Sequence, residues 1–112
     1  MGWRPQVKQC FMNCQRFILE GLLEVEYREG WVQTLIPMEH AWLIYKGKVL
    51  DLTLNSSRDV VYLNSHVAHV LDIQLQMVRT GRFGPVFPED LAELSPFREG
   101  MLALQKFNTL RA

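Results

Sequence analysis

Residues 37–53, PMEHAWLIYKGKVLDLT, decide the fold because they contain two β-strand signals joined by a tight break. The segments HAWLIY at 40–45 and VLDLT at 49–53 are rich in the aromatic, β-branched and aliphatic side chains of half-buried strands. Lys46 and Gly47 lie between them, and two-residue loops that contain glycine are the commonest hairpin connections. The stretch therefore predicts an antiparallel β-hairpin.

A loop formed by Lys46 and Gly47 fixes which side chains share a face of this hairpin. Directly opposed residues point to the same side, and the two-residue loop places Trp42 opposite Asp51. His40 and Asp51 are then diagonal neighbours on one face, with their backbones about 7 Å apart and their side chains within reach. A three-residue loop would put them on opposite faces.

The expected His40–Asp51 pair has two interpretations. A carboxylate that accepts one ring N–H fixes the tautomer of a histidine and stabilises its imidazolium form, which leaves the other ring nitrogen to activate a nucleophile. In the alternative interpretation, two polar groups on a partly buried sheet face satisfy each other. The catalytic interpretation requires a nucleophile elsewhere in the chain.

Cys10 is the candidate nucleophile. It lies in the first turn of a helix predicted from the apolar spacing of residues 9–22. A helix start favours a thiolate, and its backbone N–H groups can bind an oxyanion. Cys14 lies one turn further along the same face and is expected to be a core thiol. Cys10 as a second core cysteine is the alternative, because free cysteines are often buried.

The rest of the chain predicts a small α+β domain. We expect strands at 23–28 and 31–36, separated by a break at Glu29 and Gly30, before the two hairpin strands. Ser65 is a candidate N-cap for a helix that runs to Thr80 and is closed by Gly81. Short helices are expected at 89–94 and from Pro96 onward. The sequence thus predicts an N-terminal helix packed on an antiparallel sheet of about four strands, followed by C-terminal helices.

The length and composition fit one domain over residues 1–112, with the helix and sheet in residues 10–53 and a loop and helices in residues 54–112. The chain has 48% hydrophobic residues, and its 12 basic and 12 acidic side chains balance. This balance excludes a strongly basic nucleic-acid surface, and no apolar run approaches the roughly 20 residues of a membrane span. The two cysteines, four positions apart, do not suggest a disulfide scaffold, and we expect a cytoplasmic protein.

Five short motifs in order resemble a family of small bacteriophage and prophage proteins. They are CFMN at 10–13, YREGW at 27–31, PMEHAW at 37–42, GKVLDLT at 47–53 and TGRFG at 80–84. The order Cys10, His40, Asp51 also resembles the transglutaminase-like and papain-like cysteine hydrolases and acyltransferases. In that group, the cysteine begins a helix packed on a sheet whose strands carry the histidine and the acid.

This resemblance implies a papain-like core with a Cys10, His40 and Asp51 triad that acts on an amide or thioester bond of a protein or small substrate, without a metal or cofactor. The candidates for contacts with the substrate or the oxyanion are Gln9, Phe11, Asn13 and Trp42. The sequence departs from the papain-like pattern at Arg4, where those enzymes carry an oxyanion-hole glutamine. It also departs at Leu52, where the acid is commonly followed by proline.

Other interpretations of the polar residues remain open. Cys10, Cys14, His66 and His69 form a Cys2His2 set, although their spacing is unlike that of zinc fingers. A solvent-exposed helix face is the better explanation for a second set, made of His66, His69, Asp72, Gln76 and Arg79. The alternative to an enzyme is a non-catalytic phage-type interaction module that binds and inhibits a host or defence protein.

Overall fold

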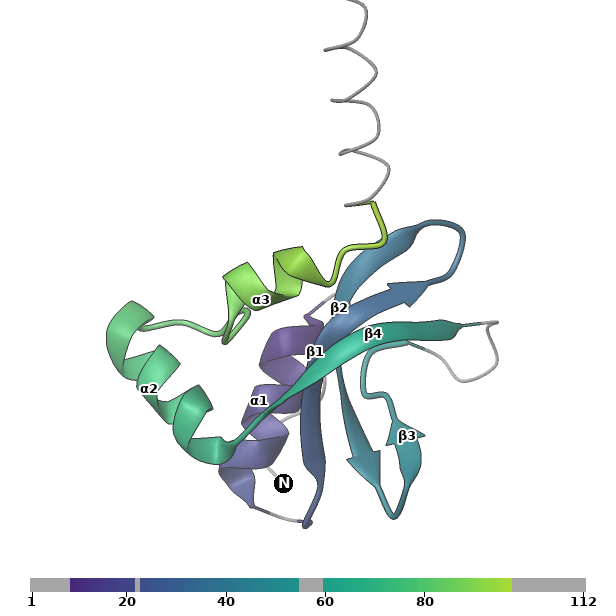
Figure 1. Cartoon of the computed structure of the whole chain (residues 1–112). Coiled ribbons are helices and arrows are strands. Elements are labelled where there is room, and N and C mark those ends of the chain that lie inside the picture. The colour runs from purple at the N-terminus through teal and green to yellow at the C-terminus, as the bar shows by residue number, and fades with distance from the viewer. Residues whose placement is uncertain (1–8, 22, 55–59, 98–112) are drawn as a thin grey trace, which may run out of the picture.

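A computed structural model describes residues 9–21, 23–54 and 60–97. Within these residues the chain forms one antiparallel sheet of four strands and three helices, so the predicted α+β class is confirmed (Figure 1). In chain order the elements are α1 (Cys10–Glu20), β1 (Glu26–Gln33), β2 (Pro37–Tyr45), β3 (Lys48–Leu50), β4 (Val61–Ala68), α2 (Val70–Thr80) and α3 (Pro88–Glu93).

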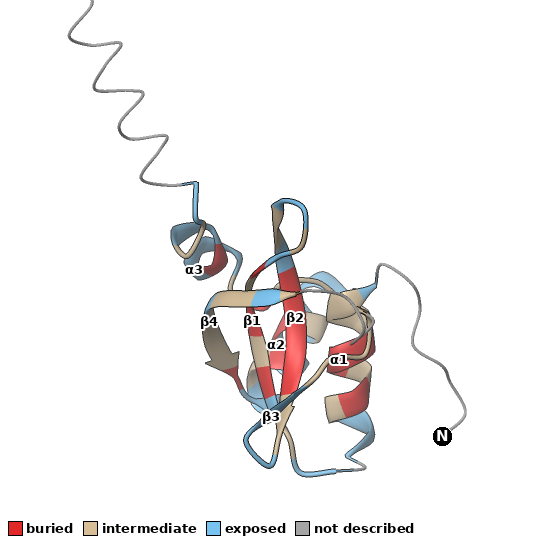
Figure 2. Cartoon of the chain, turned by 90° about the vertical axis from the view of Figure 1, so that its right-hand side faces the viewer, coloured by how far each residue is buried: buried red, intermediate tan, exposed pale blue. Residues whose placement is uncertain are grey.

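The helices pack against one face of the sheet, whose strand order is β3-β2-β1-β4. Figure 2 shows buried residues along β1, β2 and the face of α1 that meets them. The core joins side chains of α1, the sheet, α2 and the loop before α3, and consists of Cys14, Phe17, Tyr27, Ala41, Leu43, Ala68, Ile73 and Val86. This core fixes α1 against β2, and the start of α1 is where Cys10 lies.

The β2–β3 hairpin has the predicted two-residue loop. Tyr45 pairs with Lys48, and Ile44 pairs with Val49. Lys46 and Gly47 both have positive φ angles, 51° and 77°, as a tight turn that follows the twist of the strands requires. β3 ends at Leu50, so Asp51 lies just beyond the strand rather than within it.

β1 is one strand, so the expected break at Glu29 and Gly30 is wrong. Both residues pair with β2 and with β4 in the middle of the sheet. An acid followed by glycine is typical of a turn, but here the acid is fully buried and hydrogen bonded. Tertiary contacts therefore override the local signal.

The helix expected from Ser65 begins instead at Val70, with His69 as its N-cap. Ser65 and His66 lie in β4, the fourth strand, so the sheet is not confined to residues 10–53 as expected. Pairing with β1 determines this outcome, and Asp72 caps the shorter helix by accepting a hydrogen bond from the His69 N–H. The predicted end of this helix at Gly81 is confirmed by its left-handed conformation.

The last described helix, α3, agrees with the prediction for residues 89–94 to within one residue. The helix expected from Pro96 falls almost entirely outside the described residues. None of the described helices has the length and apolar character that a bilayer crossing requires.

A buried acid connects β1 to the loop before α3. Glu29 is fully buried, and its carboxyl oxygens accept hydrogen bonds from Tyr27 Oη, Val86 N and Phe87 N. Gln15 of α1 donates to Tyr27 Oη and to the carbonyl oxygen of Gly84 in the same loop. These polar contacts hold the loop over the sheet inside an otherwise apolar core.

The ladder between β1 and β4 shifts by one residue. Glu29 pairs with His66 and Gly30 with Ser65, but further along the strand Val32 pairs with Tyr62 instead of Leu63. One extra residue of β4 is therefore accommodated opposite Trp31, directly beside the Gly30–Ser65 pair, as in a β-bulge. A Cβ on Gly30 would overlap Asn64 O and lie 2.6 Å from Ser65 Cβ, so the bulge requires a glycine at this position.

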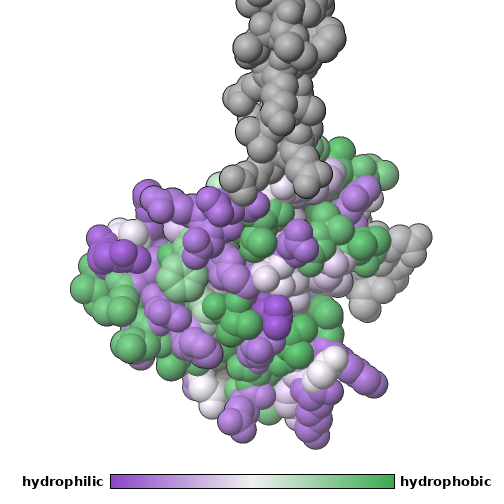
Figure 3. All heavy atoms as spheres, viewed as in Figure 1, coloured by the Kyte–Doolittle hydropathy of each residue, from purple (hydrophilic) through white to green (hydrophobic). Residues whose placement is uncertain are grey.

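Not all apolar side chains of the described residues are buried. Four side chains of α2 are at least 46% exposed, and they contribute to the apolar area over α2 in Figure 3: Val70, Leu71, Leu75 and Val78. Leu35 and Ile36 in the β1–β2 turn are 96% and 67% exposed.

Gly30→Ala should destabilise the fold by about 3 kcal/mol, because the added methyl group collides with the β4 backbone rather than with a flexible side chain. Urea unfolding measures the change. Gly84→Ala is the matched control, since the nearest atom to its Cβ would be Gln76 Nε2 at 3.8 Å. Equal stability of the two variants would contradict the tight approach at the bulge.

Glu29→Gln should cost about 3 kcal/mol of unfolding free energy, because whichever oxygen becomes the NH2 group then faces the N–H of Val86. Glu26→Gln is the control on the same strand, since the Glu26 side chain is 41% exposed and pairs only with Arg28 at the surface. Thermal unfolding should show a large loss of stability in Glu29→Gln and none in Glu26→Gln.

Candidate active site

The hairpin brings His40 and Asp51 together as the sequence predicts. His40 Nε2 lies 2.8 Å from Asp51 Oδ2, and the two side chains are only 3% and 8% exposed. Because Asp51 accepts a hydrogen bond at Nε2, Nδ1 is the ring nitrogen that remains for a further partner. The geometry is that of an imidazole oriented by a carboxylate.

Cys10 is the second partner of the His40 ring. The Cys10 side chain interacts with His40 and raises the pKa of the imidazole. The thiol is not part of a disulfide and is half-buried. Cys10 is the first residue of α1, as predicted. The structure therefore places the three residues in the order Cys10, His40, Asp51, with the imidazole in the middle.

The protonation of His40 reflects this arrangement. Burial lowers the pKa of the imidazole, but hydrogen bonds to Asp51 and Cys10 outweigh burial and raise the pKa from 6.5 to about 9. His40 consequently holds the imidazolium form at neutral pH. An imidazolium next to a cysteine sulfur is the electrostatic setting that stabilises a thiolate.

Asp51 is held by four donors. Its Oδ1 accepts hydrogen bonds from the backbone N–H groups of Thr53 and Leu54, each at 2.9 Å, and its Oδ2 accepts from His40 and from Tyr62 Oη. Burial raises the pKa of this carboxyl, but these hydrogen bonds outweigh burial and lower it below its ordinary value. Asp51 is therefore an ionised group with a fixed orientation.

The start of α1 supplies backbone donors beside the thiol. The first hydrogen bond within the helix runs from Asn13 N to Gln9 O, so the N–H groups of Cys10, Phe11 and Met12 precede the ladder. The Gln9 side chain makes no capping hydrogen bond to them. Such N–H groups can stabilise negative charge that develops on a substrate oxygen near Cys10.

The four residues named for substrate or oxyanion contacts divide into two groups. Gln9 is exposed at the N-cap of α1, and Phe11 is half-buried against the core, so both remain near the thiol. Asn13 is fully buried, and its Nδ2 donates to Thr53 Oγ1 at 2.9 Å, so it links α1 to the turn after Asp51. Trp42 is 2% exposed and stacks on the His40 ring, which makes it a support rather than a substrate contact.

Cys14 is a core thiol, as predicted. It is fully buried, and its Sγ donates to the carbonyl oxygen of Ala41 at 3.5 Å. Burial raises the pKa of the Cys14 thiol strongly. The two cysteines thus have different environments, and only Cys10 has solvent exposure.

Tyr62 contacts the site, and no motif in the sequence indicates this. Its hydroxyl lies 2.6 Å from Asp51 Oδ2, and it lies in β4, although only a loop and helices are expected from the sequence in residues 54–112. The Thr53 backbone N–H donates to Asp51 Oδ1 two residues earlier, which is the hydrogen bond of an Asx turn.

The Cys2His2 set of the sequence analysis does not assemble among the described residues. Cys14 is in the core, and His66 lies in β4 beside Glu29, where its Nε2 is 3.4 Å from Oε1 without hydrogen-bond geometry. No cluster of three or more His, Cys, Asp or Glu in the described ranges is arranged to hold a metal ion. The expected exposed helix face is also wrong, because Gln76 is 4% exposed and His66 is not in the helix.

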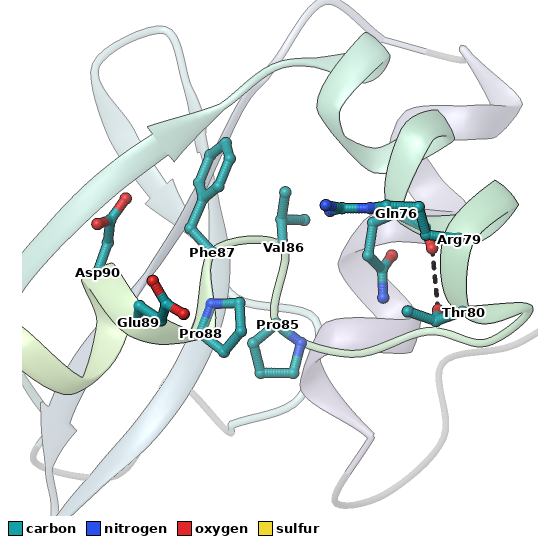
Figure 4. A pocket seen from close by; sticks show the side chains of 9 residues that line it. All are labelled: Gln76, Arg79, Thr80, Pro85, Val86, Phe87, Pro88, Glu89 and Asp90. Carbon is teal, nitrogen blue, oxygen red and sulfur yellow. Dashed lines mark hydrogen bonds between the residues drawn. The ribbon is translucent and has the colours of Figure 1, made fainter.

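A cavity of about 510 Å³ lies between the end of α2 and the loop that leads into α3 (Figure 4). Its lining includes Arg79 and Gln76 on one side and Phe87, Glu89 and Asp90 on the other. Cys10, His40 and Asp51 do not line it. The candidate active site is therefore a separate place in the fold, at the start of α1.

Asp51→Asn should lower the pKa of His40 from about 9, because the amide removes the carboxylate charge that opposes the effect of burial. NMR titration of the His40 ring measures the midpoint. Since the raised pKa stabilises the fold fully below pH 6.5 and loses that effect as pH rises through about 9, the stability gap between wild type and variant should shrink over this range. A gap that is constant between pH 6 and 10 would contradict the coupling.

No protein-family model, no curated protein and no solved structure matches the chain.

Proposed function

We propose that this protein is a cysteine-dependent hydrolase or acyltransferase that acts on an amide or thioester bond, with Cys10 as nucleophile, His40 as base and Asp51 as the orienting acid. One observation carries the proposal: His40 Nε2 lies 2.8 Å from Asp51 Oδ2, and the Cys10 side chain also interacts with the imidazole and raises its pKa. Structural His–Asp pairs need no thiol at the free ring nitrogen, whereas nucleophile activation does.

The chemistry follows from these positions. In the proposed mechanism the proton of Cys10 is already held by His40 as the imidazolium, and the cysteine sulfur attacks the substrate carbonyl carbon, which forms a C–S bond and a tetrahedral oxyanion beside the N–H groups at the start of α1. Collapse of this intermediate breaks the bond to the leaving group, which takes the proton from His40. Water or an amine, deprotonated by His40, then attacks the acyl-cysteine and releases Cys10.

The arrangement supports a papain-like or transglutaminase-like core as part of the proposal. A cysteine is the first residue of a helix packed on an antiparallel sheet, the histidine lies on β2, and the acid follows β3. Arg4, which stands where papain-like enzymes carry a glutamine, lies outside the described residues. We assign the oxyanion donors to the backbone at the start of α1 and not to a side chain.

A second function is favoured by a different observation. The exposed apolar side chains of Leu35 and Ile36 at the β1–β2 turn are typical of a surface that meets another protein. In this case the chain is a phage-type interaction module that inhibits a host or defence protein. Substituting alanine for His40 would leave such a function intact in a folded variant, whereas it would abolish catalysis.

Cys10→Ala should abolish labelling of the native protein by iodoacetamide at pH 7, and Cys14→Ala should leave it unchanged, because only Cys10 is both exposed and paired with the imidazolium. His40→Ala should slow the labelling of Cys10 by at least about tenfold, the effect of losing a charge-assisted hydrogen bond. Mass spectrometry of the intact chain gives the rates.

Circular dichroism confirms that each variant is folded, and labelling in urea shows that both thiols react once exposed. Equal labelling of the two cysteine variants would contradict the assignment of the nucleophile. A rate at Cys10 that does not depend on His40 would favour the interaction module. Release of a chromophore from acyl thioester and anilide probes then separates the two bond types.

A further inference from the structure

Tyr62 contacts the proposed site through Asp51. Its hydroxyl donates to Asp51 Oδ2 at 2.6 Å, and the same oxygen accepts the hydrogen bond of His40 Nε2 at 2.8 Å. Tyr62 and Asp51 are eleven residues apart in the chain and come from different parts of the fold. The carboxylate oxygen that orients His40 is therefore shared with a second donor.

The β-bulge determines that Tyr62 lies on this side of the sheet. Gly30 pairs with His40, and Val32 lies on the same face because strand side chains alternate. Val32 pairs with Tyr62 only because β4 carries one extra residue between Ser65 and Tyr62. With the register that holds from Tyr27 to Gly30, Leu63 would oppose Val32, and Tyr62 would oppose Gln33 and point to the helix face.

The ring of Tyr62 is held independently of its hydroxyl. It packs edge-on against Trp42, with ring centroids 4.9 Å apart, and Trp42 in turn stacks on His40 at 6.1 Å. Trp42 is almost fully buried. The phenol is thus a rigid donor aimed at Asp51, and bulges are frequent beside active sites, where they redirect a side chain.

We propose that Tyr62 is a positioning residue of the Cys10, His40 and Asp51 site, brought to it by the bulge at Gly30; this inference rests on the proposed function. The two backbone donors at Oδ1 fix one oxygen of Asp51. Tyr62 fixes the other oxygen, so the carboxylate keeps the angle at which His40 Nε2 donates and His40 Nδ1 faces Cys10.

Two substitutions separate positioning from packing. Tyr62→Phe removes the hydroxyl and keeps the ring against Trp42, whereas Tyr62→Leu removes both. Iodoacetamide labelling of Cys10 at pH 7 should slow about tenfold in both variants, as expected for the loss of a hydrogen bond to a charged group. The melting temperature should fall appreciably only in the leucine variant. Tyr45→Phe on β2, where the ring contacts Lys46, is the matched control and should keep the wild-type rate.

The His40 ring gives a second readout that does not depend on thiol reactivity. The proton on Nε2, which Asp51 accepts, should exchange with solvent about tenfold faster in Tyr62→Phe than in wild type. NMR of the ring N–H resonance measures this exchange. Rates are recorded at a temperature at which circular dichroism shows every variant folded.

The outcomes distinguish the inference from the function on which it rests. One outcome is that Tyr62→Phe matches wild type in both the Cys10 labelling rate and the exchange rate of the His40 proton, while only Tyr62→Leu changes both rates and loses stability. In that case Tyr62 is a packing residue and the inference is overturned. If labelling of Cys10 is independent of His40 in the wild-type protein, the proposed function fails. The exchange of the His40 proton then still decides whether Tyr62 positions Asp51.

Discussion

The site depends on how a nearly buried carboxylate is satisfied. Asp51 has little access to water, so its two oxygens need donors at fixed positions, and they receive two from its own turn and one each from His40 and Tyr62. Each donor comes from a segment that must already be in place. The hairpin, the bulged strand and the turn that Asn13 ties to α1 therefore become mutually dependent through one side chain.

Glu29 is a second buried carboxylate that needs hydrogen-bond donors, on the other face of the sheet. It is fully buried, and its donors come from β1 and from the loop that leads into α3. The two carboxylates thus organise different layers: Glu29 fixes the helical cover, and Asp51 fixes the candidate site. Because Gly30 follows Glu29 directly, the middle of β1 supports both faces, with an acid on one side and a close backbone approach on the other.

The sequence was sufficient where the controlling interactions are local. The tight turn at Gly47 set the hairpin register, and a helix start at Cys10 follows from apolar spacing, so two elements of the candidate site were placed correctly. The failures have non-local causes. Glu29 looked like a turn residue because its burial depends on a loop more than fifty positions away, and Ser65 looked like a helix cap because its pairing with β1 is not encoded nearby. Tyr62 was missed because a one-residue register shift leaves no local trace.

The bulge beside the Gly30–Ser65 pair also determines which sequence changes β4 can accept without losing the site. In a regular strand, the types of side chain determine the packing, and many substitutions of similar shape preserve that packing. In β4 the number of residues between Tyr62 and Ser65 matters as well. A chain one residue shorter here would have nearly the same composition, but Tyr62 would point to the opposite face of the sheet. Proteins that share this fold should therefore keep or lose the site mainly through insertions and deletions in this segment, and less through substitutions.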